Sequence, residues 1–227
     1  MLPQWIEHHR LIGVQHFFIY INEPFENADL IHNRPYVTYI PFDFRHYPNR
    51  RNFYFQAIWQ NDCVYRAKNA SVSWVGLYDI DEYWFLKSPP YTLDSVTKKH
   101  ENKNIVGIPI NNRWYGPHPN EPGTHNMHKL PGNLLMDYVW SAPDNSGPNK
   151  FIVNPKLVDY YFVHWVTGKK EGSHYVKAPN EKIQMNHYRR PYDHVHTFEE
   201  ERNWKRMVKN TSMRDQFKAG VLKALVG

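Results

Sequence analysis

The sequence predicts an α/β fold in which helices flank a mixed, mostly parallel sheet, and three observations lead to this prediction. The run at 73–78 is apolar without alternation, which suits a strand buried on both faces. An amphipathic segment at 52–69 separates it from an earlier β-prone run, an order that indicates a right-handed crossover. The 227 residues contain no linker-like stretch, so we expect one domain spanning residues 1–227.

The first elements are predicted from helical spacing and from β-branched runs. Pro3 suits the first turn of a helix and Gly13 its end, so a helix is expected over 3–13. β-prone runs at 16–21 and 36–42 predict two strands. Since this order starts on a helix, we expect a first strand of the sheet to precede residue 1.

The later elements are predicted from the same periodicities. Helices are expected over 52–69, 93–99 and 198–225, and strands over 73–83, 104–110, 134–140, 151–153 and 159–166. The segment at 111–132 has no regular periodicity and combines Gly and Pro with aromatic and histidine side chains. Long irregular segments inside compact domains are usually functional or mobile, so we expect a substrate-facing loop there.

The predicted strand at 73–83 ends abruptly in carboxylates. Asp79 and Asp81 are two residues apart, and on an extended backbone their side chains would point to the same side. Two such carboxylates suit Mg²⁺ or Mn²⁺, which complete their coordination with water and substrate phosphates. A solvated turn or a helix cap is the alternative interpretation. The position favours a ligand site, because ligands of open α/β sheets bind beyond the carboxyl ends of the strands.

The charge of the chain favours an anionic partner. There are 28 Lys and Arg against 22 Asp and Glu, a formal charge of +6, and these residues are scattered rather than massed in one tract. A sugar-nucleotide diphosphate fits this balance as well as a nucleic acid does. Aromatic residues make up 16% of the chain, and aromatic faces are common where sugars or bases stack.

The cysteine count and the hydropathy pattern bear on disulfide bonds, membrane spans and cellular location. Cys63 is the only cysteine, so no intrachain disulfide can form. No apolar stretch reaches about 18 residues and no charged-then-apolar leader opens the sequence, so we expect no membrane span in it. The expected location is the cytoplasm, or the Golgi lumen if a leader or an anchor has been removed.

Four motifs, taken in order, resemble a known enzyme family. They are Trp5-Ile6-Glu7-His8-His9, Phe17-Phe18-Ile19-Tyr20-Ile21-Asn22, the run from Trp74 to Tyr83 with its Asp-x-Asp-Glu, and Asn186-His187-Tyr188. Together they are similar to the family 92 and family 2-like glycosyltransferases over most of residues 3–190. The resemblance implies a single GT-A domain, a Rossmann-like fold whose Asp-x-Asp carboxylates bind the divalent metal of a nucleotide sugar.

The resemblance also implies roles for single residues. Asp81 is expected to bind the metal, and Asp79 to lie near the metal or the ribose. Asn22 would end the strand that flanks the nucleotide. His187 would be a late ligand of the metal or of the diphosphate.

Further donor contacts are suggested by the residues themselves. Gln56 lies on the polar face of the helix expected over 52–69 and would reach the donor, with a solvated helix side chain as the alternative. Arg189 or Arg190 would add positive charge at the diphosphate oxygens.

The expected function is transfer of a sugar from a UDP- or GDP-sugar to a glycan or another hydroxyl acceptor, with inversion and with Mn²⁺ or Mg²⁺ as cofactor. The metal would neutralise the diphosphate leaving group. Inversion also needs a carboxylate that takes the proton of the acceptor hydroxyl. Glu121, Asp137 and Glu171 are candidates for this base, and the sequence does not choose among them.

Two other classes compete with glycosyl transfer. A phosphatase of the haloacid dehalogenase type also ends a buried strand with Asp-x-Asp, but Tyr83 stands where that family has Thr or Val. A non-enzymatic module that binds nucleic acid or a glycan would use the basic and aromatic residues at 45–54 and 114–128. No RNA-binding signature accompanies them, so we expect no nucleic-acid partner.

Overall fold

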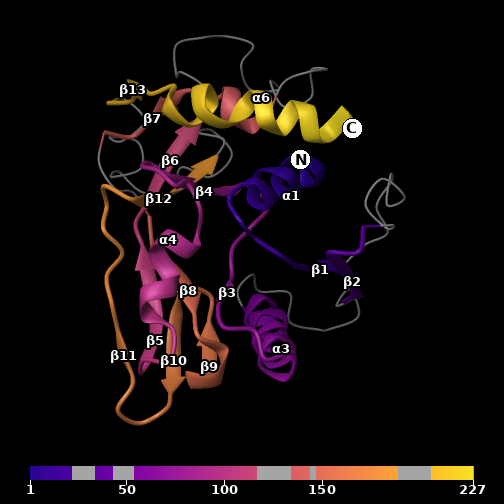
Figure 1. Ribbon diagram of the computed structural model, residues 1–227, viewed down its shortest axis with the longest axis vertical. Coiled ribbons are helices and arrows are strands. Elements are labelled where there is room, and N and C mark those ends of the chain that lie inside the picture. The colour runs from indigo at the N-terminus through magenta and orange to yellow at the C-terminus, as the bar shows by residue number, and fades with distance from the viewer. Residues whose placement is uncertain (22–33, 43–53, 117–133, 144–146, 189–205, 227) are drawn as a thin grey trace.

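The computed structural model describes residues 1–21, 34–42, 54–116, 134–143, 147–188 and 206–226 (Figure 1). Its α-helices are α1 (Leu2–Leu11), α3 (Tyr54–Asn69), α4 (Asp94–Thr97) and α6 (Ser212–Val226). Short 3-10 helices are η1 (Lys98–His100), η3 (Leu135–Asp137) and η4 (Pro155–Leu157). The helices expected over 3–13, 52–69 and 93–99 are thus confirmed. Of the helix expected over 198–225, residues 212–225 lie in α6, residues 206–211 are not helical, and residues 198–205 lie outside the described residues.

The strands are β1 (Phe17–Ile21), β2 (Val37–Pro41), β3 (Val75–Gly76), β4 (Glu82–Leu86), β5 (Ile105–Ile110), β6 (Asn112–Gly116), β7 (Trp140–Ser141), β8 (Lys150–Val153), β9 (Val158–Phe162), β10 (Trp165–Lys169), β11 (His174–Tyr175), β12 (Ile183–Tyr188) and β13 (Val208–Lys209). β1, β2, β5 and β8 confirm the strands expected at those places. The strands form a β1-β2 pair, a β9-β10 hairpin, a four-stranded sheet in the order β11-β5-β8-β3 and a five-stranded sheet in the order β13-β7-β6-β12-β4. In Figure 1 the five-stranded sheet lies above the four-stranded one, with α6 across the top and α3 beside the lower sheet.

The expectation of one mostly parallel sheet is wrong for the described strands. Among them, parallel pairing is limited to β1-β2, β5-β11 and β6-β12, and the other pairs are antiparallel. The expected crossover through α3 does not close within one sheet, because β2 pairs with β1 whereas β3 pairs with β8. The apolar run at 73–78 does not form a parallel strand buried on both faces: β3 is short, its two residues are only partly buried, and it pairs antiparallel with β8.

The strand expected at 73–83 is two short strands joined by a turn. β3 belongs to the four-stranded sheet and β4 to the five-stranded sheet. Between them the N–H of Glu82 donates to the main-chain oxygen of Asp79 at 3.0 Å, which closes the turn. The chain therefore passes from one sheet to the other at residues 78–82, named here the acidic turn.

Three further segments differ from the expectations. Residues 112–116, expected in a loop, form β6 because they pair with both β12 and β7; the rest of that loop lies outside the described residues. The segment at 134–140 is η3 followed by the start of β7, and the carboxylate of Asp137 holds η3 by accepting from the N–H of Leu134 at 2.8 Å. The segment at 159–166 bends into the β9-β10 hairpin.

Helix α1 covers the free edge of β4, which is the last strand of its sheet. The indole N–H of Trp5 donates to the main-chain oxygen of Glu82 at 2.9 Å. Nε2 of His8 donates to the main-chain oxygen of Trp84 at 2.9 Å, and Nε2 of His9 accepts from the Trp84 N–H at 3.3 Å. These side chains take the place of a neighbouring strand and fix the start of β4 beside the acidic turn.

Two apolar clusters hold the acidic turn from its two sides. Leu77, just before the turn, packs in the cluster beneath α3, together with residues such as Val153 and Tyr161. Tyr83, just after the turn, packs in the cluster beneath α1 and α6. Both side chains are essentially buried, so the main chain is fixed where the carboxylates leave it.

Candidate functional site

Asp79 is held through both oxygens of its carboxylate. Gln56 of α3 donates from Nε2 to Oδ1 at 3.1 Å, and Lys150 of β8 donates from Nζ to Oδ2 at 3.1 Å. The side chain nevertheless keeps 41% of its accessible surface. A carboxylate offers about four lone-pair sites, so Asp79 is fixed in direction and can still accept hydrogen bonds from a ligand.

Lys150 is a buried cation between two carboxylates. Its Nζ also lies 3.2 Å from Oε2 of Glu82, and the side chains of Lys150 and Glu82 are each 1% exposed. Burial disfavours the ammonium group, but the charges of Glu82 and Asp79 outweigh this and raise the pKa of Lys150. Oε2 of Glu82 also accepts from the main-chain N–H of Asp79 at 2.9 Å. Lys150 therefore stays charged and fixes the shape of the acidic turn.

Asp81 and His187 meet because β4 and β12 pair antiparallel. The register places His187 opposite Glu82, and the N–H of Tyr188 donates to the main-chain oxygen of Asp81 at 2.8 Å. Nε2 of His187 lies 3.4 Å from Oδ2 of Asp81, and its Nδ1 lies 3.5 Å from Oε1 of Glu82. Burial raises the pKa of Asp81, but the hydrogen bond and charge of His187 outweigh it and the pKa is lowered. Asp81 is thus ionised at neutral pH, beside an imidazole nitrogen.

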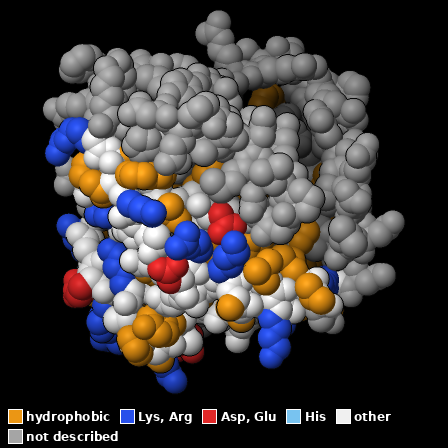
Figure 2. Space-filling model, turned by 90° about the horizontal axis from the view of Figure 1, so that it is seen from above, with side chains coloured by type: hydrophobic (Ala, Val, Ile, Leu, Met, Phe, Trp, Pro, Cys, Tyr) orange, Lys and Arg blue, Asp and Glu red, His pale blue; other side chains and the backbone are white. Residues whose placement is uncertain are grey.

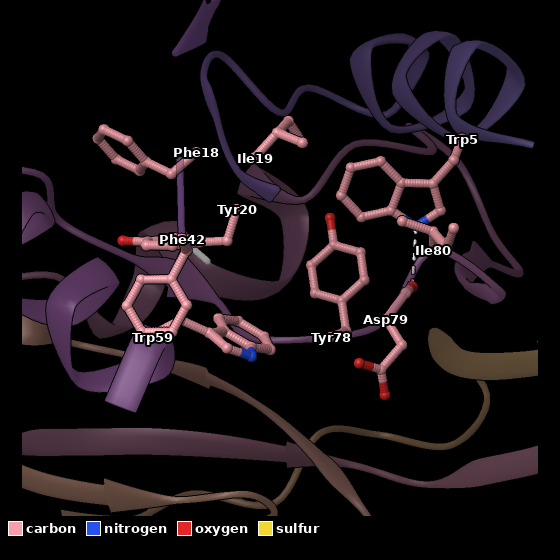
Figure 3. Close-up of a pocket in the computed structure, with 9 residues that line it drawn as sticks. All are labelled: Trp5, Phe18, Ile19, Tyr20, Phe42, Trp59, Tyr78, Asp79 and Ile80. Atoms are coloured by element: carbon pink, nitrogen blue, oxygen red, sulfur yellow. Dashed lines mark hydrogen bonds between the residues drawn. The ribbon is translucent and has the colours of Figure 1, made fainter. Parts of the chain in front are cut away.

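An open pocket of about 330 Å³ lies beside the acidic turn (Figure 3). Its lining is mostly aromatic and consists of Trp5, Phe18, Ile19, Tyr20, Phe42, Trp59, Tyr78, Asp79 and Ile80. Figure 3 shows Phe18, Tyr20, Phe42 and Trp59 on one side and Trp5 with Asp79 and Ile80 on the other. The aromatic faces suit a flat ring that can stack on them, and the carboxylate at the edge can accept hydrogen bonds from hydroxyl groups of the same ligand.

Four of the predicted site residues are brought together in two pairs. Gln56 contacts Asp79, and Asp81 contacts His187. The two pairs are joined by residues to which the sequence analysis gave no role, since Lys150 and Glu82 lie between them. A lysine at the start of an apolar strand is usually exposed to solvent. Lys150 is therefore recognised as part of the site only from its burial between two carboxylates.

The remaining predicted site residues do not join this group. Asp137 caps η3 and binds Lys218 of α6 at 2.7 Å. Glu171 is exposed in the turn between β10 and β11. The predictions for Asn22, Glu121, Arg189 and Arg190 lie outside the described residues.

The donor atoms of the site form a pair rather than a complete metal cage. Within the described residues, no three His, Cys, Asp or Glu side chains converge as metal ligands. Asp81 and His187 alone would leave most of the coordination of a Mg²⁺ or Mn²⁺ ion to water and phosphate oxygens, which is usual for these ions.

Two further properties of the described part of the chain are relevant. None of its helices is both long enough and apolar enough to cross a membrane. On the face seen in Figure 2, Lys and Arg side chains are interspersed with hydrophobic and acidic ones and form no continuous basic surface among the described residues.

Comparison with known proteins points to one family. The family model described as glycosyltransferase family 92 matches residues 1–225. Two curated matches from Ricinus communis are both named as glycosyltransferase family 92 proteins. One is 22% identical over 206 residues, which are 83% of this chain and 33% of the relative; the other is 23% identical over 209 residues, or 83% and 32%. The chain spans about a third of the length of these relatives.

Proposed function

The chain belongs to glycosyltransferase family 92, and from this we propose that it transfers a sugar from a nucleotide-diphosphate donor to a hydroxyl group of a glycan acceptor. The observation that supports the proposal most directly is the Asp81–His187 pair beside an aromatic pocket that ends at Asp79. The nucleoside of a nucleotide sugar would lie in the pocket, and its diphosphate would lie at the Asp81–His187 pair.

The pocket would bind the nucleoside. Rings such as those of Trp59 and Tyr20 provide faces on which a base can stack. Asp79 lines the same pocket, and the hydrogen bonds from Gln56 and Lys150 hold its carboxylate in place. Its remaining lone pairs would accept hydrogen bonds from the ribose hydroxyl groups. UDP and GDP sugars are both part of this proposal.

The proposal includes Mn²⁺ or Mg²⁺ held by Asp81 and His187. A separation of 3.4 Å between Oδ2 and Nε2 allows one ion to contact both atoms, and a carboxylate with an imidazole is a suitable donor set for Mn²⁺. Nδ1 of His187 lies 3.5 Å from Oε1 of Glu82 and 3.5 Å from Nδ2 of Asn112, and the tautomer with its proton on Nδ1 toward Glu82 would leave the lone pair of Nε2 for the ion. When bound, the metal would neutralise the charge that develops on the diphosphate leaving group.

The remaining parts of the proposal are the GT-A arrangement and inversion. A parallel β1-β2 pair next to α3 and the acidic turn is compatible with a Rossmann-like nucleotide-binding half. Inversion needs a carboxylate base, and Asp137 is poorly suited because Leu134 and Lys218 engage its two oxygens. Glu121 and Glu171 stay candidates.

The test compares donor binding by the parent protein and by Asp81→Asn. Thermal unfolding is measured with UDP, GDP, UDP-glucose, UDP-galactose, UDP-N-acetylglucosamine and GDP-mannose, each with and without Mn²⁺. We expect Mn²⁺-dependent stabilisation of the parent by at least one sugar nucleotide. Asp81→Asn should lose it, because an amide has the size of the carboxylate but not its charge.

Asp159→Asn is the matched control, since this exposed carboxylate pairs with Lys170 in the β9-β10 region. Absence of stabilisation of the parent by every probe contradicts donor binding. Equal stabilisation of the parent and Asp81→Asn contradicts only the metal-binding role of Asp81.

A further inference from the structure

Three aromatic rings on one side of the open pocket come from three parts of the chain. They belong to Tyr20 of β1, Phe42 just after β2 and Trp59 of α3, and are named here the ring wall (Figure 3). The centroid of the Tyr20 ring lies 5.6 Å from that of Trp59, at an interplanar angle of 34°. It lies 5.9 Å from that of Phe42, at 85°. Tyr20 contacts both other rings, so its position bears on the whole ring wall.

The hydroxyl group of Tyr20 is held by a carboxylate of α3. It donates to Oδ2 of Asp62 at 2.6 Å, and Nε of Arg66 donates to the same oxygen at 2.6 Å. Burial and this hydrogen bond raise the pKa of Tyr20. Burial also raises the pKa of Asp62, but the hydrogen bonds from Arg66 and Tyr20 outweigh it and lower that pKa. At neutral pH a protonated hydroxyl group therefore donates to an ionised carboxylate, which is a strong kind of hydrogen bond.

The same helix holds both sides of the pocket. Gln56 holds the carboxylate of Asp79 on one side, and Asp62 holds Tyr20 on the other. Trp59, midway between them on α3, belongs to the ring wall itself. Residues three apart are neighbours on a helix surface, and six residues extend an α-helix by about 9 Å. One rigid element thus fixes where the ring wall stands relative to the carboxylate.

A ring that is fixed before binding favours stacking. Among the described strands, β1 pairs only with β2, so the ring of Tyr20 depends on side-chain contacts for its orientation. The bond to Asp62 is one of these contacts and acts at the far end of the side chain. Ordering one mobile side chain on binding lowers affinity by about two- to tenfold. Loss of the bond would therefore weaken a ligand that stacks on this ring.

We propose that Asp62 is a positioning residue for the donor: through the hydroxyl group of Tyr20 it holds the ring on which the base stacks, and Arg66 holds Asp62. The inference rests on the proposed function, because the base is that of the nucleotide donor. The competing explanation is structural: the bond between Tyr20 and Asp62 only fastens β1 to α3. The two differ in whether the folded protein loses affinity for the nucleoside part of its ligand and for no other part.

The experiment separates binding of the nucleoside from binding of the diphosphate. Calorimetric titrations with Mn²⁺ use UDP, GDP and inorganic pyrophosphate, at a temperature at which each protein is folded. The proteins are the parent, Tyr20→Phe, Asp62→Ala and the double variant. We expect each single variant to bind UDP or GDP about three- to tenfold more weakly than the parent does. Affinity for pyrophosphate, which has no base, should stay unchanged.

Further variants distinguish positioning from general damage. The double variant should lose no more affinity than either single variant, because all three break the same hydrogen bond. Asp62→Asn should retain part of the affinity, since an amide oxygen still accepts from the hydroxyl group. Asp159→Ala is the matched control: it removes another partly exposed carboxylate, which pairs with Lys170 at 2.8 Å, and should bind like the parent.

Unchanged affinity of Tyr20→Phe and Asp62→Ala for UDP and GDP overturns the inference. An equal loss of affinity for pyrophosphate also overturns it, and so do losses that add up in the double variant. If Asp62→Ala does not fold, Tyr20→Phe, which keeps the ring, decides by the same comparison with pyrophosphate. Failure of the parent to bind UDP and GDP is instead a failure of the proposed function, and the inference falls with it.

Discussion

Oδ2 of Asp81 lies 3.4 Å from Nε2 of His187, and this contact joins two motifs that are far apart in the sequence. It depends on the register of one strand pair, in which His187 stands opposite Glu82. A shift of one residue would turn the imidazole to the other face of the sheet. The pairing of β4 with β12 is therefore what forms the candidate metal site.

Replacing His187 by Ala should weaken metal binding. We expect the affinity for Mn²⁺ in the presence of UDP or GDP to fall by about tenfold or more, the usual size of the loss of a ligand or its supporting partner. Calorimetric titration of Mn²⁺ into the nucleotide-bound variant measures it, with His100→Ala of η1 as control. An affinity equal to that of the parent would remove His187 from the site.

Replacing Lys150 by Met should destabilise the fold. The methionine fills the space but leaves Asp79 and Glu82 without their shared cation, and breaking a buried ion pair in this way costs about 3–5 kcal/mol. Urea unfolding measures the change. Adding Glu82→Gln should restore part of the stability, because the buried charge is then removed. A loss below about 1 kcal/mol in Lys150→Met would contradict the structural role of the ammonium group.

The free energy of unfolding should fall as the pH drops below the ordinary pKa of histidine. Burial lowers the pKa of His8 from 6.5 to about 4, so between these values the unfolded chain binds more protons than the folded one. The contribution of His8 is fully present above about pH 6.5 and is lost as the pH falls through about 4, a change of about 3 kcal/mol. The pKa of His9 is lowered as well, by burial and by His8, which steepens the dependence.

Urea unfolding of the parent and of His8→Gln, measured between about pH 4.5 and pH 7.5, tests this dependence. Glutamine does not titrate, so the free energy of unfolding of the variant should depend less steeply on pH. The variant also loses stability at neutral pH where the bond to Trp84 weakens, and this offset is separate from the slope. Parallel pH profiles would show that His8 does not titrate as its burial implies.

Replacing Val163 by Gly should relieve backbone strain in the turn of the β9-β10 hairpin, where Val163 has a φ of 48°. Glycine adopts positive φ without a steric penalty, which favours the folded state by about 1–3 kcal/mol, against about 0.5–1 kcal/mol of extra chain entropy in the unfolded state. The valine is only 4% exposed, so glycine also loses about 1.5–3 kcal/mol of apolar burial. We therefore expect a free energy of unfolding, measured by urea unfolding, close to or slightly below that of the parent. A loss above about 3 kcal/mol would show that no strain is relieved.

The sequence by itself determined the elements with strong local periodicity and the family of the chain. The spacing in α1 and α3 and the apolar runs of β1, β5 and β8 reveal these elements, because helical and strand periods depend on near neighbours. The order of the motifs at 5–9, 79–82 and 186–188 leads to the family in the same way. Asp79, Asp81 and His187 could be selected because each lies in one of these motifs.

Only the tertiary structure decided how these residues are arranged. The run at 73–83 splits between two sheets because β3 and β4 find partners far along the chain, which no local pattern encodes. The same holds for Lys150, whose role follows from its burial between Asp79 and Glu82. The turn of the β9-β10 hairpin is likewise held by Gln60, whose amide binds the main chain of Val163 across a long stretch of sequence. Charges and strain of this kind are set by contacts between distant residues, and they exist only once the chain has folded.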